Sequence, residues 1–191
     1  MLSRVLAPRT FMLSPITMRS FATIKVGDSF PSCKVGLVKH GGGNGGYENS
    51  HIDTAEYLAN KKVVLVAIPG AFTPVCMGTH LPEYINDATK IKSSGVDEII
   101  CLTVNDPWVT TAFAEKLNGK QHLTYIADGN GELMKKLGLE FDVTAALLGV
   151  RMRRASMLVT NGKVMEFNDE NGGALTETSC SATMIKQCGK K

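Results

Sequence analysis

The feature that most constrains the fold is an uninterrupted apolar run, Val63-Val64-Leu65-Val66-Ala67-Ile68, which follows Lys62 and ends at Pro69-Gly70. Most of its residues are β-branched and none is polar, so the run predicts a strand that is covered on both faces. Such strands are typical of the middle of an α/β sheet. Residues 98–104 (EIICLTV) form a second run of this kind, and residues 123–127 predict a third strand.

Helical segments separate these strands. Residues 76–93 predict a helix that bends at Pro82, whose ring removes a backbone hydrogen bond. A second helix is expected to begin near Pro107, because proline is favoured at the first helical position. Residues 132–137 predict a short helix that Gly138 closes.

The two ends of the chain differ from this alternating centre. Residues 32–40 predict one more strand, and the glycine-rich run 41–46 predicts a loop or a hairpin tip. We interpret this run as a connector, because no Lys-Ser/Thr pair follows it as a phosphate-binding loop requires. Towards the C-terminus, residues 154–159 and 163–167 flank Asn161-Gly162, which is a strong hairpin signal.

The order of these elements predicts the fold class. Parallel βαβ units, an antiparallel hairpin and a final helix over residues 180–187 predict an α/β fold with a central mixed β-sheet flanked by helices, on a thioredoxin-like plan. A chain of 191 residues is too short for two comfortable cores. We therefore expect one domain, spanning residues 23–191.

The first 22 residues have a composition of their own. They contain Arg4, Arg9 and Arg19, several serines and threonines, and no acidic residue before Asp28. This composition is typical of a mitochondrial transit peptide, so residues 1–22 predict delivery to the mitochondrial matrix. The alternative is a basic tail without a targeting role, on a cytoplasmic protein.

Charge and hydropathy exclude two classes of partner. The net charge is only +3, and much of the basic excess lies near the two ends of the chain. No long basic stripe interleaved with aromatic residues is present, so we expect no nucleic-acid binding. No run approaches the roughly 18 apolar residues of a membrane span, so we expect no membrane insertion.

The cysteines point to redox chemistry rather than to a structural role. There are five, at positions 33, 76, 101, 180 and 188, and none is spaced as C-x-x-C. This spacing argues against a zinc site and against a thioredoxin-type dithiol, and the odd number argues against a secreted disulfide framework. The pattern favours a reducing compartment with one or two working thiols.

Cys76 has the most informative position. It follows the buried strand and the Pro-Gly break, at the start of a helix, where sheets of this class bind ligands. The free N–H groups and the dipole of a helix N-terminus favour a thiolate, which can attack a peroxide. Thr73 can supply a hydroxyl to the sulfur and to the peroxide. The alternative for Cys76 is an inert, buried small residue.

These residues belong to a longer motif. Residues 69–82, Pro-Gly-Ala-Phe-Thr-Pro-Val-Cys-Met-Gly-Thr-His-Leu-Pro, resemble the active-site signature of the peroxiredoxins. The form PGAFTPxC followed by HLP resembles the atypical two-cysteine subfamily, which includes plant type-II and animal mitochondrial or peroxisomal enzymes. The resemblance extends to residues 95–107 and 154–157 and covers essentially the whole chain after residue 22.

The resemblance implies a thiol-dependent peroxidase that reduces hydrogen peroxide and organic hydroperoxides without metal or cofactor. It implies that Cys76 is the peroxidatic cysteine and that Pro69 and Thr73 shape its pocket. It also implies an arginine from a distant strand, which it places at Arg154. The neighbouring arginines of this segment, 151 and 153, are the alternatives, although we expect both on a solvated strand face. The subfamily further implies a homodimer.

A second cysteine is needed to complete the cycle that the subfamily implies. Cys180 lies in a Thr-Ser-Cys-Ser step that resembles the animal-type resolving position, so we expect an intramolecular disulfide with Cys76 and recycling by thioredoxin. Plant type-II enzymes lack a cysteine there. Cys101 is expected in the core and Cys188 in a frayed C-terminus. The alternative is a one-cysteine cycle, with glutathione and glutaredoxin as the external thiol.

Two further functions remain as alternatives. One is a non-catalytic redox relay that retains the thioredoxin-like scaffold, which the presence of Thr73, Cys76 and Arg154 disfavours. The other is an oxidoreductase of protein disulfides, which the missing C-x-x-C disfavours. His80 is interpreted as a packing or capping residue, and Trp108 as a core residue.

Overall fold

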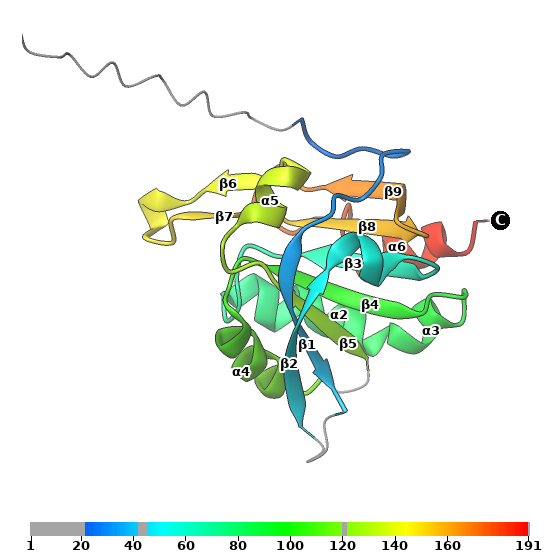
Figure 1. Ribbon diagram of the computed structural model, residues 1–191, viewed down its shortest axis with the longest axis horizontal. Coiled ribbons are helices and arrows are strands. Elements are labelled where there is room, and N and C mark those ends of the chain that lie inside the picture. Colours follow the sequence, from blue (N-terminus) through cyan, green and yellow to red (C-terminus); the bar gives the residue numbers. More distant parts are fainter. Residues whose placement is uncertain (1–21, 42–45, 120–121, 191) are drawn as a thin grey trace, which may run out of the picture.

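The computed structural model describes residues 22–41, 46–119 and 122–190, and the predicted transit peptide up to residue 21 lies outside these ranges. Across the described ranges the chain forms a seven-stranded sheet in the order β2-β1-β5-β4-β3-β8-β9 and a separate two-stranded hairpin, β6-β7 (Figure 1). The strands are β1 (Lys34–His40), β2 (Tyr47–Asp53), β3 (Lys62–Ala67), β4 (Glu98–Thr103), β5 (Leu123–Ala127), β6 (Glu140–Asp142), β7 (Val150–Met152), β8 (Ala155–Thr160) and β9 (Lys163–Asp169).

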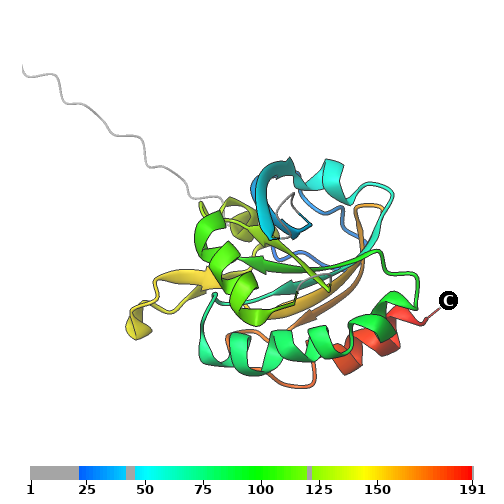
Figure 2. The same ribbon diagram turned by 90° about the horizontal axis from the view of Figure 1, so that it is seen from below.

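Helices connect and cover these strands. They are α1 (Thr54–Leu58), the π-helix η1 (Cys76–His80), α2 (Leu81–Asn86), α3 (Ala88–Lys92), α4 (Pro107–Leu117), α5 (Glu132–Leu137), the 3-10 helix η2 (Thr144–Ala146) and α6 (Ser181–Cys188). Helices α2, α3 and α6 lie along one face of the sheet, and α1 and α5 lie on the other (Figure 2).

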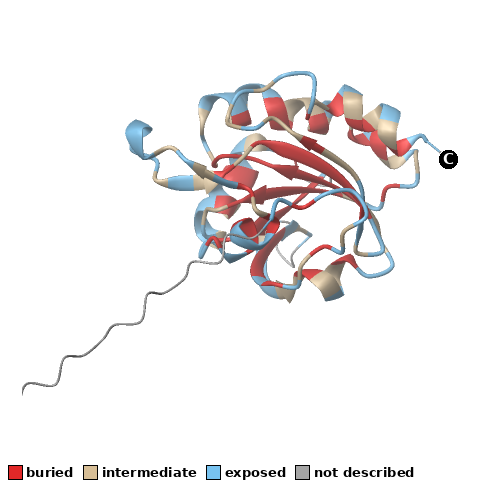
Figure 3. Ribbon diagram, turned by 90° about the horizontal axis from the view of Figure 1, so that it is seen from above, coloured by how far each residue is buried: buried red, intermediate tan, exposed pale blue. Residues whose placement is uncertain are grey.

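The sheet is mixed, as the order of the elements predicted. Strand β3 pairs in parallel with β4, and β4 with β5, whereas β1, β2, β8 and β9 join antiparallel. Successive side chains of β3 alternate between the two cores: Val63 and Leu65 pack on the side of α1 and α5, and Val64 and Val66 on the side of α2, α3 and α6. Burial of the sheet between these layers is visible in Figure 3. The α/β fold and the central mixed sheet are confirmed.

The strands β2, β6 and β7 were not predicted from the sequence. Strand β2 lies at the edge of the sheet and its residues are polar at most positions, so it has no alternating apolar pattern. Strands β6 and β7 have three residues each, which is too short for a pattern. Together they form an arm that projects from the body of the molecule (Figure 1).

Three local predictions were wrong. The helix that follows Cys76 is interrupted at Asp87, between α2 and α3, and not at Pro82. Pro82 lies in the first turn of α2, where a missing N–H is tolerated. Trp108 is 76% exposed rather than in the core. Cys188 is 2% exposed in the core under α6, so it is not in a frayed end. In the part of the chain that the structure describes, no helix is long and apolar enough to span a bilayer.

Candidate active site

The candidate site lies where β3 ends. The carboxyl ends of the parallel strands β3 and β4 meet there, so the loop after β3 and the loop after β4 are neighbours. Cys76 is the first residue of η1, and its carbonyl accepts the backbone N–H of Leu81, five residues on, which makes the turn wider than an α-helical one. The Cys76 side chain is fully buried.

The loop that leads to Cys76 is held by polar contacts on both sides. The Asn105 side-chain oxygen accepts the Ala71 N–H at 2.8 Å and the Thr103 hydroxyl at 2.7 Å, and so joins the loop to the end of β4. The Thr73 hydroxyl donates to the Gly70 carbonyl at 2.9 Å. These bonds fix the backbone ahead of the sulfur.

Phe72 shows that this loop is also under strain. Its φ of 61° lies in the left-handed region, which non-glycine residues adopt at a cost of about 1–3 kcal/mol. The ring packs edge-on against Phe113 of α4, with centroids 5.2 Å apart. Pro69 at the start of the loop is buried, so solvent does not reach the loop where it leaves β3. Strained backbone of this kind is concentrated at functional sites.

Arg154 brings a positive charge to the sulfur. Its guanidinium donates through NH2 to the Cys76 Sγ at 3.4 Å, and through Nε and NH2 to the Gly173 carbonyl at 3.0 and 2.9 Å. Arg154 is 1% exposed, and among the described residues no carboxylate forms an ion pair with it. A buried cation without a carboxylate is costly, so a thiolate at Cys76 would be the stabilising counter-charge.

His80 contacts the same guanidinium. Arg154 NH1 donates to His80 Nδ1 at 2.9 Å, and His80 Nε2 donates to the Ser179 carbonyl at 3.1 Å. The pKa of His80 is lowered to about 4, chiefly by burial; the hydrogen bond to Ser179 opposes this, and the Arg154 charge lowers the pKa to a lesser degree. The ring is therefore neutral at physiological pH. His80 is buried, as a packing residue would be, but it makes no capping bond.

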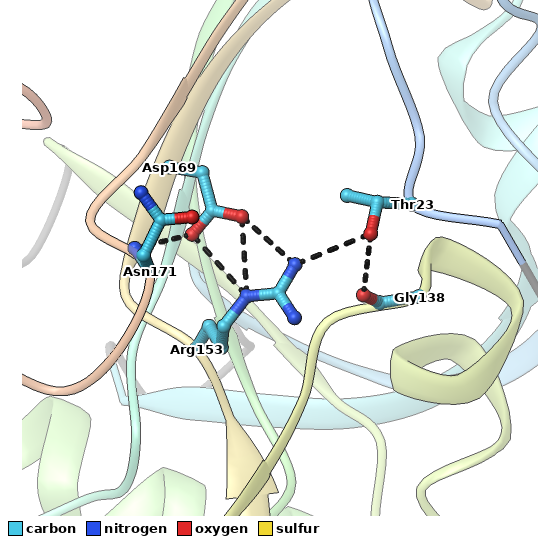
Figure 4. A network of polar contacts seen from close by, with 5 residues as sticks. All are labelled: Thr23, Gly138, Arg153, Asp169 and Asn171. Atoms are coloured by element: carbon cyan, nitrogen blue, oxygen red, sulfur yellow. Dashed lines mark hydrogen bonds and ion pairs between the residues drawn. The ribbon is translucent and has the colours of Figure 1, made fainter.

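The other two candidate arginines of this segment do not touch the sulfur. Arg153 forms an ion pair with Asp169 at 2.8 Å and a further bond to Thr23, whose hydroxyl donates to Gly138 (Figure 4). This is not the solvated strand face that the sequence predicted, because both ends of the pair are mostly buried. Arg151 Nε donates to the Leu148 carbonyl at 2.7 Å, and its NH1 lies against the backbone of Gly70.

The segment after β9 carries the predicted resolving cysteine. The Glu170 carboxylate accepts the Ser179 N–H and hydroxyl at 2.9 and 2.8 Å, and it also binds both the N–H and the hydroxyl of Thr176. Cys180 follows at the start of α6, half-buried, with its Sγ 3.1 Å from the Glu177 carbonyl. The structure thus places Cys180 directly after the residue that His80 contacts.

The remaining cysteines lack the features of reactive thiols. Cys33, Cys101 and Cys188 are buried, and burial raises the pKa of all three thiols. A raised pKa leaves less of the nucleophilic thiolate. Among the described residues, no group of three or more histidine, cysteine, aspartate and glutamate side chains could hold a metal ion.

Sequence reasoning missed several residues that build this site. Asn105 follows a buried strand at the sheet edge where Cys76 lies, and this position could have identified it. The carbonyls of Gly173 and Ser179 carry no side-chain signal, so only the folded chain shows their contacts with Arg154 and His80.

Comparison with known proteins agrees with this geometry. The family model described as Redoxin matches residues 25–179. Peroxiredoxin-2D of Arabidopsis thaliana is 41% identical over 161 residues, which are 83% of this chain and 94% of that protein. The chain belongs to the peroxiredoxin family. This peroxiredoxin is accordingly an enzyme, a thiol-dependent peroxidase with a thioredoxin-like fold.

Two further peroxiredoxins are similar to this one. Peroxiredoxin-2F, mitochondrial, of Oryza sativa subsp. japonica is 46% identical over 110 residues, which cover 58% of this chain and 56% of that protein. The crystal structure of reduced Prx3 from Vibrio vulnificus in complex with hydrogen peroxide has a TM-score of 0.77 and 36% identity, and the match covers 87% of this chain and 99% of that one.

Proposed function

We propose that Cys76 is the nucleophile of this peroxiredoxin, with Arg154 and Thr73 as its partners and Pro69 closing the pocket. The observation that carries the proposal is the buried contact between the Arg154 guanidinium and the Cys76 sulfur at 3.4 Å. A guanidinium in this position stabilises the thiolate, and its remaining donor capacity suits the charge that develops on a peroxide oxygen.

The reaction follows from this arrangement. The Cys76 thiolate attacks one peroxide oxygen, the O–O bond breaks, and the other oxygen leaves as hydroxide or alkoxide and takes a proton from solvent. Cys76 is thereby oxidised to a sulfenic acid, and the peroxide is reduced to water or an alcohol. Hydrogen peroxide and organic hydroperoxides are both substrates of this chemistry. The complex of the Vibrio vulnificus relative with hydrogen peroxide supports this substrate class.

One substitution pair tests the nucleophile. Cys76→Ser is expected to abolish peroxide consumption, because an alcohol at this position is not ionised. Cys101→Ala, at a fully buried position in β4, is the matched control and should retain turnover. Undiminished peroxide consumption by Cys76→Ser would refute this assignment.

For the second step we propose Cys180 as the resolving thiol. Cys180 is the half-buried cysteine of the chain, whereas the other four are buried, and it adjoins the Ser179 contact with His80. Its thiolate attacks the Cys76 sulfenic sulfur, an S–S bond forms, and hydroxide leaves as water. The two thiols now face Arg154 and the Glu177 carbonyl, so at least one segment moves before a bond of about 2.05 Å can form.

Mass spectrometry after one equivalent of peroxide tests this step. We expect a Cys76–Cys180 disulfide, which thioredoxin reduces. A persistent sulfenate with a free Cys180 would contradict it. Full turnover of Cys180→Ser with thioredoxin would also contradict it and would favour the one-cysteine cycle with glutathione and glutaredoxin.

The assembly and the compartment are part of the proposal. Large apolar side chains are exposed in three segments: Phe72 and Val75 in the loop before Cys76, Trp108 and Val109 at the start of α4, and Leu147, Leu148 and Val150 in the β6-β7 arm. Exposed apolar side chains of this size support a homodimer that covers them. The basic leader, with no acidic residue before Asp28, and the mitochondrial relative support delivery to the mitochondrial matrix, with the cytoplasm as the alternative.

A further inference from the structure

The hydrogen bonds of His80 determine its protonation and its orientation. Arginine can only donate, so His80 Nδ1 must accept from Arg154, and a carbonyl can only accept, so His80 Nε2 must donate to Ser179. A single neutral tautomer meets both requirements. The fully buried ring thus bridges the charged group beside Cys76 and the residue that precedes Cys180.

Tyr84 of α2 provides a natural comparison. Its hydroxyl donates to the same Ser179 carbonyl at 2.7 Å, and its ring lies edge-on to His80 with centroids 5.5 Å apart. None of its described hydrogen bonds involves Arg154. Tyr84 therefore shares one end of the His80 bridge and not the other.

We propose that His80 is a positioning residue that links the Arg154 guanidinium to the segment carrying Cys180, so that docking of this segment sets how Arg154 meets the Cys76 sulfur. The inference rests on the proposed roles of Cys76, Arg154 and Cys180. It follows from two contacts made by one rigid ring. When Ser179 is in place, it fixes the ring, and the ring holds NH1 of the guanidinium while Gly173 holds its other side.

Burial makes this link stronger than an exposed one. If the Cys180 segment leaves, the Nε2–H of His80 and the hydroxyl of Tyr84 both lose their acceptor inside the core. Unpaired buried donors are costly, so the docked position of the segment is favoured. The charged and titratable groups that face His80 are Arg154 directly before β8, Glu170 after β9, Tyr84 of α2 and Cys76 of its own helix.

Two near-isosteric substitutions separate the two ends of the bridge. In His80→Asn the amide oxygen replaces Nδ1 and can still accept from Arg154, but the donor to Ser179 is lost. In His80→Gln the amide nitrogen replaces Nε2 and can still donate to Ser179, but the acceptor for Arg154 is lost. Two readouts are measured for each full-length variant: the rate constant of Cys76 oxidation by hydrogen peroxide, and the rate at which iodoacetamide alkylates Cys180 in the reduced protein.

We expect His80→Gln to lower the peroxide rate constant about tenfold, because a bond to a charged group is lost, with little change in alkylation of Cys180. His80→Asn should lower the peroxide rate constant about threefold, because Ser179 no longer fixes the group that meets Arg154. It should also raise the Cys180 alkylation rate several-fold, because one of two bonds to the Ser179 carbonyl is lost. If the two variants changed the peroxide rate constant equally and the Cys180 alkylation rate equally, His80 would only fill space, and the proposal would be overturned.

Tyr84→Phe tests the linkage itself. It removes the bond to the Ser179 carbonyl and the contact with the Ser156 hydroxyl of β8 but no contact with Arg154, so in the wild-type background it should lower the peroxide rate constant two- to threefold. In the His80→Asn background the link is already cut, and Tyr84→Phe should have no effect on this rate constant. An equal effect in both backgrounds, or no effect in either, overturns the proposal.

These readouts remain informative in two further cases. If the His80 variants do not fold, as circular dichroism would show, the effect of Tyr84→Phe in the wild-type background decides alone. Neither readout requires a disulfide, so a failure of Cys180 as the resolving thiol would be seen separately by mass spectrometry, with the His80 results unaffected.

Discussion

The Arg154 guanidinium and the Cys76 sulfur lie 3.4 Å apart, and both side chains are buried from solvent. The two residues are 78 positions apart in the chain, and β8 and β3 bring them together by pairing antiparallel. In water a cation and a thiolate at this distance attract weakly, but burial removes much of the dielectric screening. A charge on the sulfur would therefore interact with the guanidinium more strongly here than at the surface.

The first prediction concerns the shape of this cation. Arg154 contacts the sulfur, His80 and the Gly173 carbonyl with different nitrogens, and a lysine ammonium cannot reach all three. Arg154→Lys should lower the second-order rate constant with hydrogen peroxide about a hundredfold. Stopped-flow or competition kinetics would measure it.

Arg153→Lys is the matched control for that experiment. It changes the adjacent arginine, whose partner is Asp169 on β9, and should reduce stability by about 1 kcal/mol while it leaves the peroxide rate constant unchanged. If the two lysine variants lost activity equally, the proposal that Arg154 acts at the Cys76 sulfur would be refuted.

The second prediction concerns the Thr73 hydroxyl. Thr73→Val keeps the side-chain shape but removes the bond to the Gly70 carbonyl and the group that can meet the peroxide. We expect about a tenfold lower peroxide rate constant and a loss of about 1 kcal/mol in stability. Thr73→Ser retains the hydroxyl and should be close to wild type. A Thr73→Val variant with wild-type kinetics would exclude the hydroxyl from catalysis.

The third prediction concerns the dependence of stability on pH. The pKa of His80 is lowered to about 4 in the folded state, against about 6.5 in the unfolded chain. As pH falls from 6.5 to 4, the unfolded chain binds a proton that the folded chain does not, so up to about 3 kcal/mol of stability is lost in this window. Stability from this residue is fully present above pH 6.5.

Denaturant unfolding at several pH values measures this effect. His80→Gln should flatten the slope between pH 6.5 and about 4.5, where most carboxylates are still ionised. His51→Gln, at an exposed position of β2, is the control and should leave the slope as it is. An unchanged slope in His80→Gln would show that another group titrates.

The fourth prediction concerns the exposed apolar side chains. Leu147 at the tip of the β6-β7 arm is 94% exposed, and Trp108 at the start of α4 is 76% exposed. If these side chains are covered by a second copy, Leu147→Glu should convert a dimer to a monomer in light-scattering or sedimentation measurements. Met165→Glu, an exposed apolar position on the distant strand β9, is the control. A wild-type monomer at micromolar concentration would contradict the homodimer.

The sequence predicts the centre of this fold well because the physics there is local. The strands β3, β4 and β5 are covered on both faces, and strands of this kind are predicted from largely continuous apolar runs in the sequence. The Asn161-Gly162 turn lies where the hairpin of β8 and β9 was expected. The edge strand β2 and the arm strands carry no such pattern, since exposure removes the constraint on their residue types.

The site was predictable in its residue types but not in its connections. The position of Cys76 after a buried strand and the resemblance of its motif predict the reactive region, and the arginine that contacts the Cys76 sulfur lies in the predicted segment 151–154. Which arginine faces the sulfur depends on the turn between β7 and β8, which sends Arg153 to Asp169 and Arg154 inward. The proposed role of His80 depends on a backbone carbonyl 99 residues away, and no sequence pattern encodes such a contact.

The antiparallel pairing of β8 with β3 also determines when the contact between Arg154 and Cys76 can form. A ribosome releases Cys76 before Arg154, because the two residues are 78 positions apart in the chain. Until β8 pairs with β3, the Cys76 sulfur lacks the guanidinium contact. If Arg154 activates Cys76 as proposed, the nascent chain is spared oxidation at this residue until its last strands have emerged.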